Sequence, residues 1–392
     1  MKNSYNKTLV SCFVGYIVQA IVNNFIPLLF LTFQDSYDIS LGKITLLVTF
    51  NFGVQLLVDV ISIGFVDRIG YRLSMVLAHA FSAAGLLSLT ILPEIFSDPF
   101  VGLLLSVLIY AVGGGLLEVL VSPVVEACPT DNKEKAMSLL HSFYCWGHVG
   151  VVLLSTLFFK IFGIENWKIL AAVWAIVPLL NGIAFTKVPM QKLLEEGDRG
   201  LSIKELAFSK IFWTLLLMML CAGASEQAVS QWASALAEKS FGISKTVGDL
   251  VGPMAFAILM GSSRMYYGKF GDRINLEKFM AASSILCVLS YLLIAVCPIP
   301  AFGILGCAIC GLSVGIMWPG TFSMAAAAMP RGGTALFALL ALAGDMGCSS
   351  GPTFVGLISG AVGDNLKWGV LAAVIFPILL LFGIRLMKRD KA

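Results

Sequence analysis

Long apolar stretches alternate with short polar segments along the whole chain. A stretch of about 20 apolar residues is long enough to cross the hydrocarbon core of a bilayer as an α-helix. Twelve stretches of this kind lie at residues 8–33, 42–66, 71–93, 100–126, 135–162, 167–187, 208–236, 246–268, 276–297, 300–328, 333–361 and 365–387. The alternation therefore predicts an all-α integral membrane protein with twelve transmembrane helices.

The composition supports a membrane location. Of 392 residues, 58% are hydrophobic and 12% are charged, whereas about 25% of the residues of soluble domains are charged. The first apolar stretch is too long for a cleavable signal peptide and has no small-residue cleavage site, so we expect it to remain as a helix. A chain of this composition requires a lipid bilayer around its apolar surface.

The basic residues are distributed unevenly between the two sides of the predicted membrane. Cytoplasmic loops carry an excess of Lys and Arg, and all but six of the 26 basic residues fall on the side that holds both termini. We therefore expect cytoplasmic termini in a multi-pass protein of the cell membrane. The net charge of +3 reflects this asymmetry, and nucleic acid is not an expected partner. The six residues on the other side are Lys43, Lys160, Lys168, Lys239, Lys245 and Lys367.

The longest polar stretch lies at the middle of the chain and divides it into two halves. Residues 1–188 and 207–392 each contain six apolar stretches, and residues 189–206 form a linker that we expect on the cytoplasmic side. The pattern predicts two six-helix bundles joined by this linker.

A repeated motif supports the division into two halves. Asp67-Arg68 follows the second apolar stretch, with Arg72 close behind, and Asp272-Arg273 follows the eighth. In a short turn, a carboxylate accepts bonds from a helix N-terminus, and an Arg bridges to a neighbouring helix. We expect these five residues to form gating contacts at matching places in the two bundles.

The two motif copies give the chain a resemblance to the major facilitator superfamily. In that family a Gly-x-x-x-Asp-Arg-x-Gly signature follows helix 2 and recurs after helix 8. Here Ile63 replaces the first Gly, and Asn275 replaces the last Gly of the second copy. The resemblance implies two bundles built from inverted repeats of three helices, around a cavity at the middle of the membrane. It also implies transport by alternating access, with no cofactor and no enzymatic activity.

Glu118 is a carboxylate inside the fourth apolar stretch. A charge in the middle of a bilayer is costly, so such a residue faces a protein interior or a water-filled cavity and is a candidate proton or substrate site. The segment Gly115-Leu-Leu-Glu118 and the later His141-Ser-Phe-Tyr144 resemble the L-fucose permease branch of the superfamily. That resemblance implies that Glu118 is the functional carboxylate and that His141 and Tyr144 contact sugar. The alternative is that Glu118 is structural and fixes helix packing.

The first stretch lacks the second acid that the fucose permease branch carries there. It has Asn23 and Asn24 in the corresponding segment. A mechanism with two carboxylates on helices 1 and 4 is therefore not expected.

The fifth stretch carries a polar and aromatic face. His141, Tyr144, Cys145 and His148 have offsets that place them on one side of a helix. Such a face suits a sugar, because a ring stacks on its apolar side while His and Tyr bond to its hydroxyl groups. The alternative is hydrogen bonding between helices, which is common for His in membrane bundles.

Other polar residues lie within the apolar stretches. Gln19 with Asn23 and Asn51 with Gln55 are pairs four residues apart, and each pair serves either the solute or helix packing. The remaining candidates for solute or proton binding are in the second half: Glu226, Gln227, Gln231, Trp232, Trp318 and Asp345.

Two of these residues of the second half, Glu226 and Asp345, have more than one interpretation. Glu226 either functions within the bundle or lies at the outer mouth in contact with water. Trp318 takes the place of Glu118 by repeat spacing, and Asp345 is either a second titrating group or a partner for helix backbone opened by glycines.

The sequence predicts that no Lys or Arg lies in the middle of a core helix. A transporter of anions needs such a charge to offset desolvation of its substrate. We therefore expect a neutral or cationic substrate.

Our first hypothesis is proton-coupled uptake of a neutral sugar or sugar-like solute by a monomer. Glu118 would carry the proton, with Glu226 or Asp345 as a second acid, and sodium remains an alternative to protons. The second hypothesis is a proton-coupled exporter of apolar or cationic compounds, which the Met and Phe content also suits. A membrane receptor or an enzyme is a remote third, because the sequence has no soluble domain, no metal-binding cluster and no nucleophile with a base.

Overall fold

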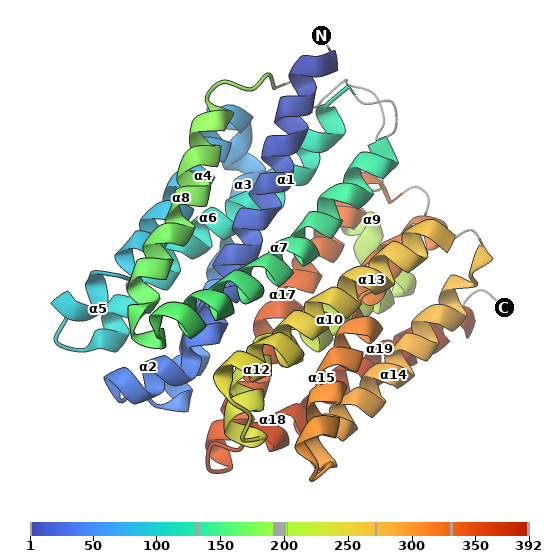
Figure 1. The fold of residues 1–392 in the computed structure, drawn as a ribbon. Helices are drawn as coiled ribbons and strands as arrows, with labels where there is room; N and C mark the ends of the chain where they lie inside the picture. Colours follow the sequence, from blue (N-terminus) through green and yellow to red (C-terminus); the bar gives the residue numbers. More distant parts are fainter. Residues whose placement is uncertain are drawn as a thin grey trace. The chain divides into compact units, whose positions relative to one another are not determined.

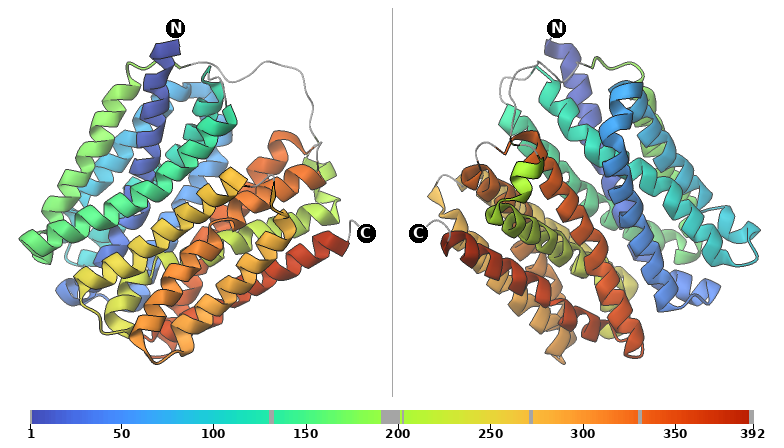
Figure 2. Two further views of the ribbon diagram at one scale, coloured as in Figure 1. Left: turned by 45° about the vertical axis from the view of Figure 1, so that its right-hand side comes forward. Right: turned by 180° about the vertical axis from the view of Figure 1, so that it is seen from behind.

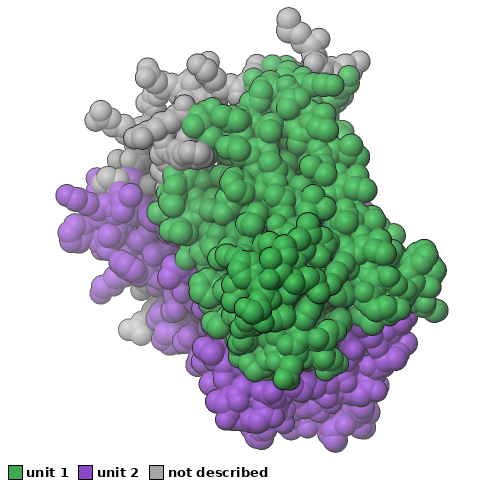
Figure 3. Space-filling view, turned by 90° about the vertical axis from the view of Figure 1, so that its left-hand side faces the viewer, with its two compact units in different colours: residues 1–195 green, residues 196–392 purple. Residues whose placement is uncertain are grey.

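The structure is a computed structural model that describes residues 2–129, 133–190, 201, 203–270, 273–329 and 332–389. All regular elements in these ranges are helical (Figure 1). The chain forms two compact units, residues 1–195 and 196–392 (Figure 3). The boundary between the units falls inside the polar segment 189–206.

Unit 1 contains the helices of the first six apolar stretches, which run side by side (Figures 1 and 2). They are α1 (Lys2–Asn24), η1 (Ile26–Leu29), α2 (Phe30–Tyr37), α3 (Leu41–Ile69), α4 (Tyr71–Ser88), α5 (Leu92–Ile95), α6 (Pro99–Ala127), α7 (Lys133–Phe162), η2 (Ile164–Asn166) and α8 (Trp167–Phe185).

Unit 2 repeats this plan with more interruptions. Its helices are α9 (Ile203–Ala207), α10 (Lys210–Ser230), α11 (Ala233–Ala235), η3 (Leu236–Ser240), α12 (Lys245–Asp249), η4 (Leu250–Met254), α13 (Ala255–Phe270), α14 (Leu276–Val296), α15 (Pro300–Val314), α16 (Met317–Ala328), α17 (Gly333–Ala361), α18 (Leu366–Ala373) and α19 (Ile375–Arg389). The segments η3 and η4 are single π-helical turns.

The helices account for the twelve predicted spans. Ten helical segments within the described residues are long and apolar enough to cross a membrane. Helices α4 and α17 occupy the two other predicted spans, 71–93 and 333–361. The prediction of an all-α membrane protein with twelve spans is confirmed.

Glycines bring α6 against three neighbouring helices in unit 1. A Cβ atom on Gly115 would lie 2.9 Å from the Cα atom of Gln55 on α3, and one on Gly114 would lie 3.1 Å from a methyl group of Val22 on α1. A Cβ atom on Gly113 would overlap with Ser82 on α4. The glycine triplet therefore lets α6 pack tightly one turn before Glu118, which places this carboxylate beside α1 and α3.

Helices α10 and α17 of unit 2 pack with a similar closeness. A Cβ atom on Gly347 would overlap with the carbonyl oxygen of Leu220, and one on Gly351 with that of Ala224. Close packing through small residues is the usual way in which helices associate in a membrane. It fixes Glu226 and Gln227, which follow on α10, relative to α17.

Several spans are interrupted beside polar residues. Helix α1 ends at Asn24, and Pro27 lies in the short 3₁₀ helix that follows. Helix α10 ends at Ser230, directly before Gln231. Non-helical backbone at membrane depth is tolerated where protein or a polar cavity surrounds it, and the residues at both breaks are buried.

Most of the lysines predicted on the non-cytoplasmic side have acidic partners. Lys43 lies 2.9 Å from Asp98, Lys168 lies 2.6 Å from Glu94, Lys239 lies 3.9 Å from Asp364 and Lys245 lies 3.1 Å from Asp249. The hydrogen bond from Lys168, followed by that from Tyr37, lowers the pKa of the Glu94 carboxyl, and the bond from Lys43 lowers the pKa of Asp98. Each of these four lysines therefore has its charge offset by a neighbouring carboxylate.

The close approach of α10 and α17 predicts the effect of adding one methyl group. We expect Gly347→Ala to destabilise the protein by about 1–3 kcal/mol, because the new methyl group overlaps with backbone. Gly53→Ala is the matched control, since a Cβ atom there meets nothing within 4 Å, and it should leave stability equal or raise it by up to about 1 kcal/mol. Thermal unfolding of detergent-purified protein measures both. Equal stability of the two variants would contradict the described packing.

Candidate substrate and proton site

A chain of hydrogen bonds joins Glu118 to four side-chain amides in unit 1. Gln19 Nε2 on α1 donates to Glu118 Oε2 on α6 at 3.2 Å and to Gln55 Oε1 on α3 at 3.0 Å. Gln55 Nε2 donates to Asn23 Oδ1 at 2.8 Å and to Asn51 Oδ1 at 3.0 Å. Asn51 Nδ2 in turn donates to Asn23 Oδ1 at 3.2 Å. The structure therefore brings together five residues that the sequence had suggested as three separate groups.

Burial explains why these groups bond to one another. The four amide residues are 2–5% exposed, and a buried polar group without a hydrogen-bond partner is unfavourable. Glu118 is only half-buried. Its carboxylate therefore accepts from the amide network and keeps part of its surface accessible.

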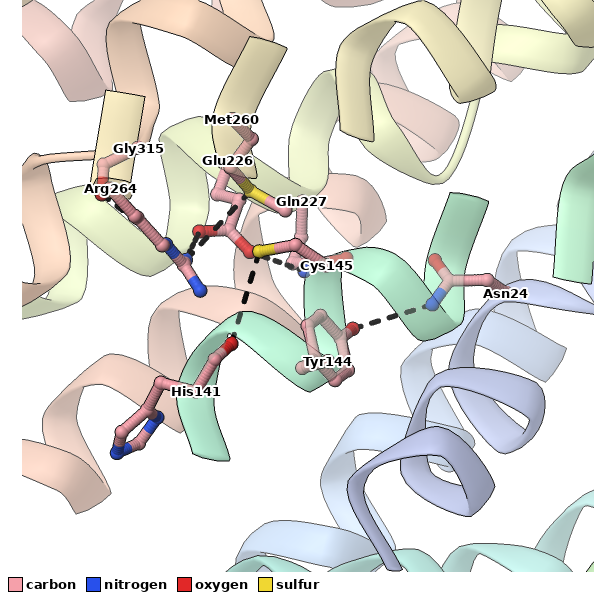
Figure 4. Close-up of polar contacts among 9 residues, drawn as sticks. All are labelled: Asn24, His141, Tyr144, Cys145, Glu226, Gln227, Met260, Arg264 and Gly315. Atoms are coloured by element: carbon pink, nitrogen blue, oxygen red, sulfur yellow. Dashed lines mark hydrogen bonds and ion pairs between the residues drawn. The ribbon is translucent and has the colours of Figure 1, made fainter. Parts of the chain in front are cut away.

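The predicted polar face of α7 is divided by burial. His141 is exposed and Tyr144 half-buried, whereas Cys145 and His148 are buried. Asn24 Nδ2 donates to the Tyr144 hydroxyl at 3.4 Å, and Cys145 Sγ lies 4.0 Å from the His141 carbonyl oxygen (Figure 4). Of these four residues, His141 and Tyr144 keep accessible surface.

A buried ion pair lies in unit 2. Arg264 Nη2 on α13 donates to Glu226 Oε2 on α10 at 3.0 Å, and Arg264 Nε donates to the Gly315 carbonyl oxygen at 3.3 Å (Figure 4). Gln227 Nε2 donates to the other carboxylate oxygen, Glu226 Oε1, at 3.2 Å, and Gln231 Nε2 donates to Gln227 Oε1 at 3.0 Å. The Glu226 and Arg264 side chains are 9% and 18% exposed.

Arg264 bears on the prediction about cations in the core helices. We predicted that no Lys or Arg lies in the middle of a core helix; Arg264 lies toward the C-terminal end of α13, and its side chain pairs with the buried Glu226. The sequence places Arg264 near the end of a span, where a long side chain usually extends to the membrane surface. It does not show that an acid on another helix holds the side chain inside.

The interior position of Glu226 decides between its two interpretations. The residue is 7% exposed and paired with Arg264, so it does not lie at an outer mouth in ordinary contact with water. Because the pair has no net charge, the presence of Arg264 does not by itself favour an anionic substrate.

The tryptophans of unit 2 differ in their surroundings. Trp232 is fully buried, and its Nε1 donates to the Pro352 carbonyl oxygen on α17 at 3.0 Å. The Trp318 ring packs on Gly344, where a Cβ atom would overlap with it, and Asp345 follows at 8% exposure. Trp232 therefore joins α10 to α17, while half-buried Trp318 is better placed to meet a solute.

The predicted gating residues are described only in part. Arg72 donates from Nη1 to the Phe185 carbonyl oxygen and from Nη2 to that of Val188, both at 2.8 Å. The Arg72 cation thus bonds to carbonyl oxygens at and just after the C-terminus of α8, where a positive charge is favourable. Arg273 is exposed. The side chains of Asp67 and Arg68, and all of Asp272, lie outside the described residues.

Sequence reasoning missed three residues of these clusters. They are Arg264, Asn24 and Tyr16. Tyr16 bonds to Ser122 at 3.1 Å through its hydroxyl group, and its ring centroid lies 5.5 Å from that of His141. Asn24 adjoins the predicted Asn23, and Tyr16 is one turn from Gln19, so helical spacing was the available signal for both.

The helical fold and the buried polar clusters define a multi-pass membrane protein with polar side chains inside its helical bundles. Within the described residues, no group of three or more His, Cys, Asp or Glu side chains is placed to hold a metal ion. The family model of the Major Facilitator Superfamily matches residues 9–352. The chain belongs to this superfamily, whose members are transporters and not enzymes.

Solved structures of other superfamily members share the fold. A bacterial homologue of the human lysosomal transporter Spinster, in an inward-facing and occupied conformation, is 14% identical, covers 99% of this chain and 98% of its own, and has a TM-score of 0.77. The E. coli fucose:proton symporter FucP is 15% identical, with coverage of 98% and 99% and a TM-score of 0.67. No curated protein matches the chain. The resemblance to the superfamily is confirmed, and these structures show a common fold.

The buried ion pair predicts a strong dependence of stability on both partners. We expect Glu226→Gln or Arg264→Gln alone to destabilise the protein by about 3–5 kcal/mol, because each leaves an uncompensated buried charge. The double variant should lose clearly less than the sum of the two, as expected for side chains in direct contact.

Thermal unfolding of the purified variants gives this double-mutant cycle. Glu94→Gln is the control, since it removes an exposed ion pair and should change stability by at most about 1 kcal/mol. Additive effects of the two unit 2 substitutions would show that Glu226 and Arg264 are not paired.

Proposed function

We propose that the protein is a secondary active transporter that takes up a neutral sugar or sugar-like solute together with a proton, by alternating access. The observation that carries the proposal is the half-buried carboxylate of Glu118 at one end of a buried amide network. We further propose that the protein acts as a monomer in the cell membrane with both termini in the cytoplasm.

The side chains around Glu118 suit a polyhydroxylated solute. Binding sites for small molecules combine apolar walls with a few well-placed polar groups. Amides and hydroxyl groups both donate and accept hydrogen bonds, as sugar hydroxyl groups do, and Tyr144 and His141 add ring surfaces. FucP, a fucose:proton symporter by its name, offers a parallel in the same fold.

The ion pair in unit 2 supports a solute without net charge. Arg264 has its counter-charge in Glu226 at 3.0 Å, so binding an anion there would require Arg264 to exchange one carboxylate for another. A neutral solute makes no such demand. This reasoning adds to the prediction that no Lys or Arg lies in the middle of a core helix.

Glu118 is the proposed proton carrier. The neutral amide of Gln19 donates to its carboxylate at 3.2 Å, and the residue is only half-buried. Protonation of Glu226 would break its ion pair with Arg264. Asp345 remains a candidate second acid, and sodium remains an alternative ion.

The proton-carrying role predicts a selective defect. Glu118→Gln should retain solute binding and exchange but lose uphill uptake driven by a pH gradient in proteoliposomes. Glu94→Gln, the same substitution at an exposed acid of unit 1, should accumulate solute as the unaltered protein does. Uphill uptake by Glu118→Gln at the unaltered rate would refute the role of Glu118.

The solute class is tested by ligand stabilisation. A sugar present at 100 times its Kd should stabilise purified protein by about 2.7 kcal/mol, because it binds only the folded state. A panel of L-fucose, D-glucose, D-xylose and glycerol, measured by thermal shift at two pH values, should contain at least one stabilising compound. Stabilisation by lipophilic cations alone would favour the exporter hypothesis instead.

A further inference from the structure

Tyr16 lies between the helix that carries Glu118 and the helix that carries His141. Its hydroxyl group is 3.1 Å from the Ser122 Oγ atom on α6. Its ring centroid is 5.5 Å from that of His141 on α7, with 55° between the ring planes. Tyr16 is 7% exposed, so its side chain is packed among α1, α6 and α7.

The bond between Tyr16 and Ser122 is one of two side-chain contacts that join α1 to α6 near Glu118. Gln19 follows Tyr16 by three residues, and Glu118 precedes Ser122 by four. Residues three or four apart are neighbours on one helix face, so the Gln19–Glu118 bond at 3.2 Å and the Tyr16–Ser122 bond at 3.1 Å lie one turn apart. Tyr16 is therefore anchored one turn from the proposed proton carrier.

The backbones on both sides of Tyr16 are close together at glycines. A Cβ atom on Gly15 would lie 3.2 Å from a methyl group of Val121 on α6. A Cβ atom on Gly147 of α7 would lie 3.1 Å from the Cα atom of Ile17. Helix α1 therefore approaches α6 directly before Tyr16 and α7 directly after it, which leaves the Tyr16 side chain little freedom to move.

The Tyr16 ring offers His141 a fixed surface. The ring is held at its root by α1 and at its tip by the bond to Ser122. Tilted ring pairs at such a separation attract one another. His141 is exposed, and exposed side chains change rotamer within nanoseconds. The contact with Tyr16 therefore favours one orientation of the His141 imidazole.

We propose that Tyr16 is a positioning residue for solute recognition. It holds the His141 imidazole in the orientation that binds the solute, and its bond to Ser122 fixes this imidazole relative to the turn that carries Glu118. The proposal rests on the proposed function, in which His141 contacts the solute and Glu118 carries the proton. Tyr16 acts through His141 and does not itself need to touch the solute.

The position of Tyr16 relates recognition of the solute to binding of the proton. Tyr16 and Gln19 share one face of α1, so the groups proposed for the solute and for the proton are both held by this face. A binding group that is already in place loses less freedom when the solute arrives. The contact with Tyr16 therefore increases affinity without adding a bond to the solute.

The alternative is that Tyr16 only stabilises the bundle. Tyr16 belongs to a buried apolar cluster that includes Cys12, Leu117 and Val121, and loss of a core side chain generally destabilises a protein. Such a role predicts less folded protein, with unchanged solute affinity of the protein that does fold. Affinity and stability must therefore be measured separately.

The experiment measures solute affinity by thermal shift over a range of concentrations of the panel compound that stabilises the unaltered protein. Tyr16→Phe and Ser122→Ala each remove one hydroxyl group of the same bond. Each should weaken affinity by about 3-fold to 10-fold, the effect of one hydrogen bond, and the double variant should be no weaker. Ser122→Thr keeps a hydroxyl group and should keep the unaltered affinity.

A second comparison tests whether Tyr16 acts through His141. His141→Gln should weaken affinity, and Tyr16→Phe should have no further effect in that background, because the imidazole is absent. Tyr37→Phe is the matched control. It also removes a tyrosine hydroxyl group that makes a hydrogen bond, to Glu94 at 2.8 Å in another part of unit 1, and it should leave affinity unchanged.

Chemical modification shows whether the effect is located at His141. The chain has three histidines, and His79 and His148 are 0% and 2% exposed whereas His141 is exposed. Diethyl pyrocarbonate should therefore modify His141 first, as detected by mass spectrometry, and bound solute should slow this reaction. At one subsaturating solute concentration, protection should be smaller in Tyr16→Phe and unaltered in Tyr37→Phe.

The possible results separate the inference from the proposed function. Unaltered affinity in Tyr16→Phe and Ser122→Ala, or a loss in Tyr16→Phe that adds fully to that of His141→Gln, would overturn the role of Tyr16 and leave the proposed function standing. If Tyr16→Phe does not fold, the comparison of Ser122→Ala with Ser122→Thr decides in the same way. Absence of binding of every panel compound to the unaltered protein would overturn the proposed function, and the inference with it.

Discussion

A hydrocarbon environment offers no hydrogen-bond partners, so each polar group inside this protein must find its partner within the protein. Both units meet this constraint through helices that approach closely at glycines. In unit 1 the triplet beginning at Gly113 brings α6 against α3 and α1, and Glu118 meets Gln19. In unit 2, Gly315 packs against α13, and the same residue's carbonyl oxygen accepts from Arg264. The close approach of helix backbones at glycines therefore brings the buried polar side chains within hydrogen-bond distance of one another.

The two units satisfy their buried acids in different ways. The Glu118 carboxylate accepts from the amide of Gln19, whereas the Glu226 carboxylate is paired with the Arg264 guanidinium at 3.0 Å. Protonation of an acid that is paired with a cation breaks the pair and removes the counter-charge of the cation. This difference gives the first unit the titrating role in our account and the second unit a fixed, electrically neutral cluster.

Much of the fold followed from the sequence, because apolar length and the repeated Asp-Arg motif are local signals. The amide residues of unit 1 were also suggested, since Gln19 and Asn23, or Asn51 and Gln55, share a helix face at a spacing of four. Their assembly into one network was not, because it depends on how closely glycines let three helices approach. The pairing of Arg264 with Glu226 was not predicted, for a related reason. A long side chain near a helix end reaches either the surface or the interior, and only the position of Glu226 on another helix decides which.

The most direct test of the central claim is infrared difference spectroscopy of the purified protein as pH is changed. The account predicts a carboxyl absorption that appears on acidification, changes when a sugar binds, and is absent in Glu118→Gln but present in Glu226→Gln. A carboxyl absorption that persists in Glu118→Gln and disappears in Glu226→Gln would contradict it.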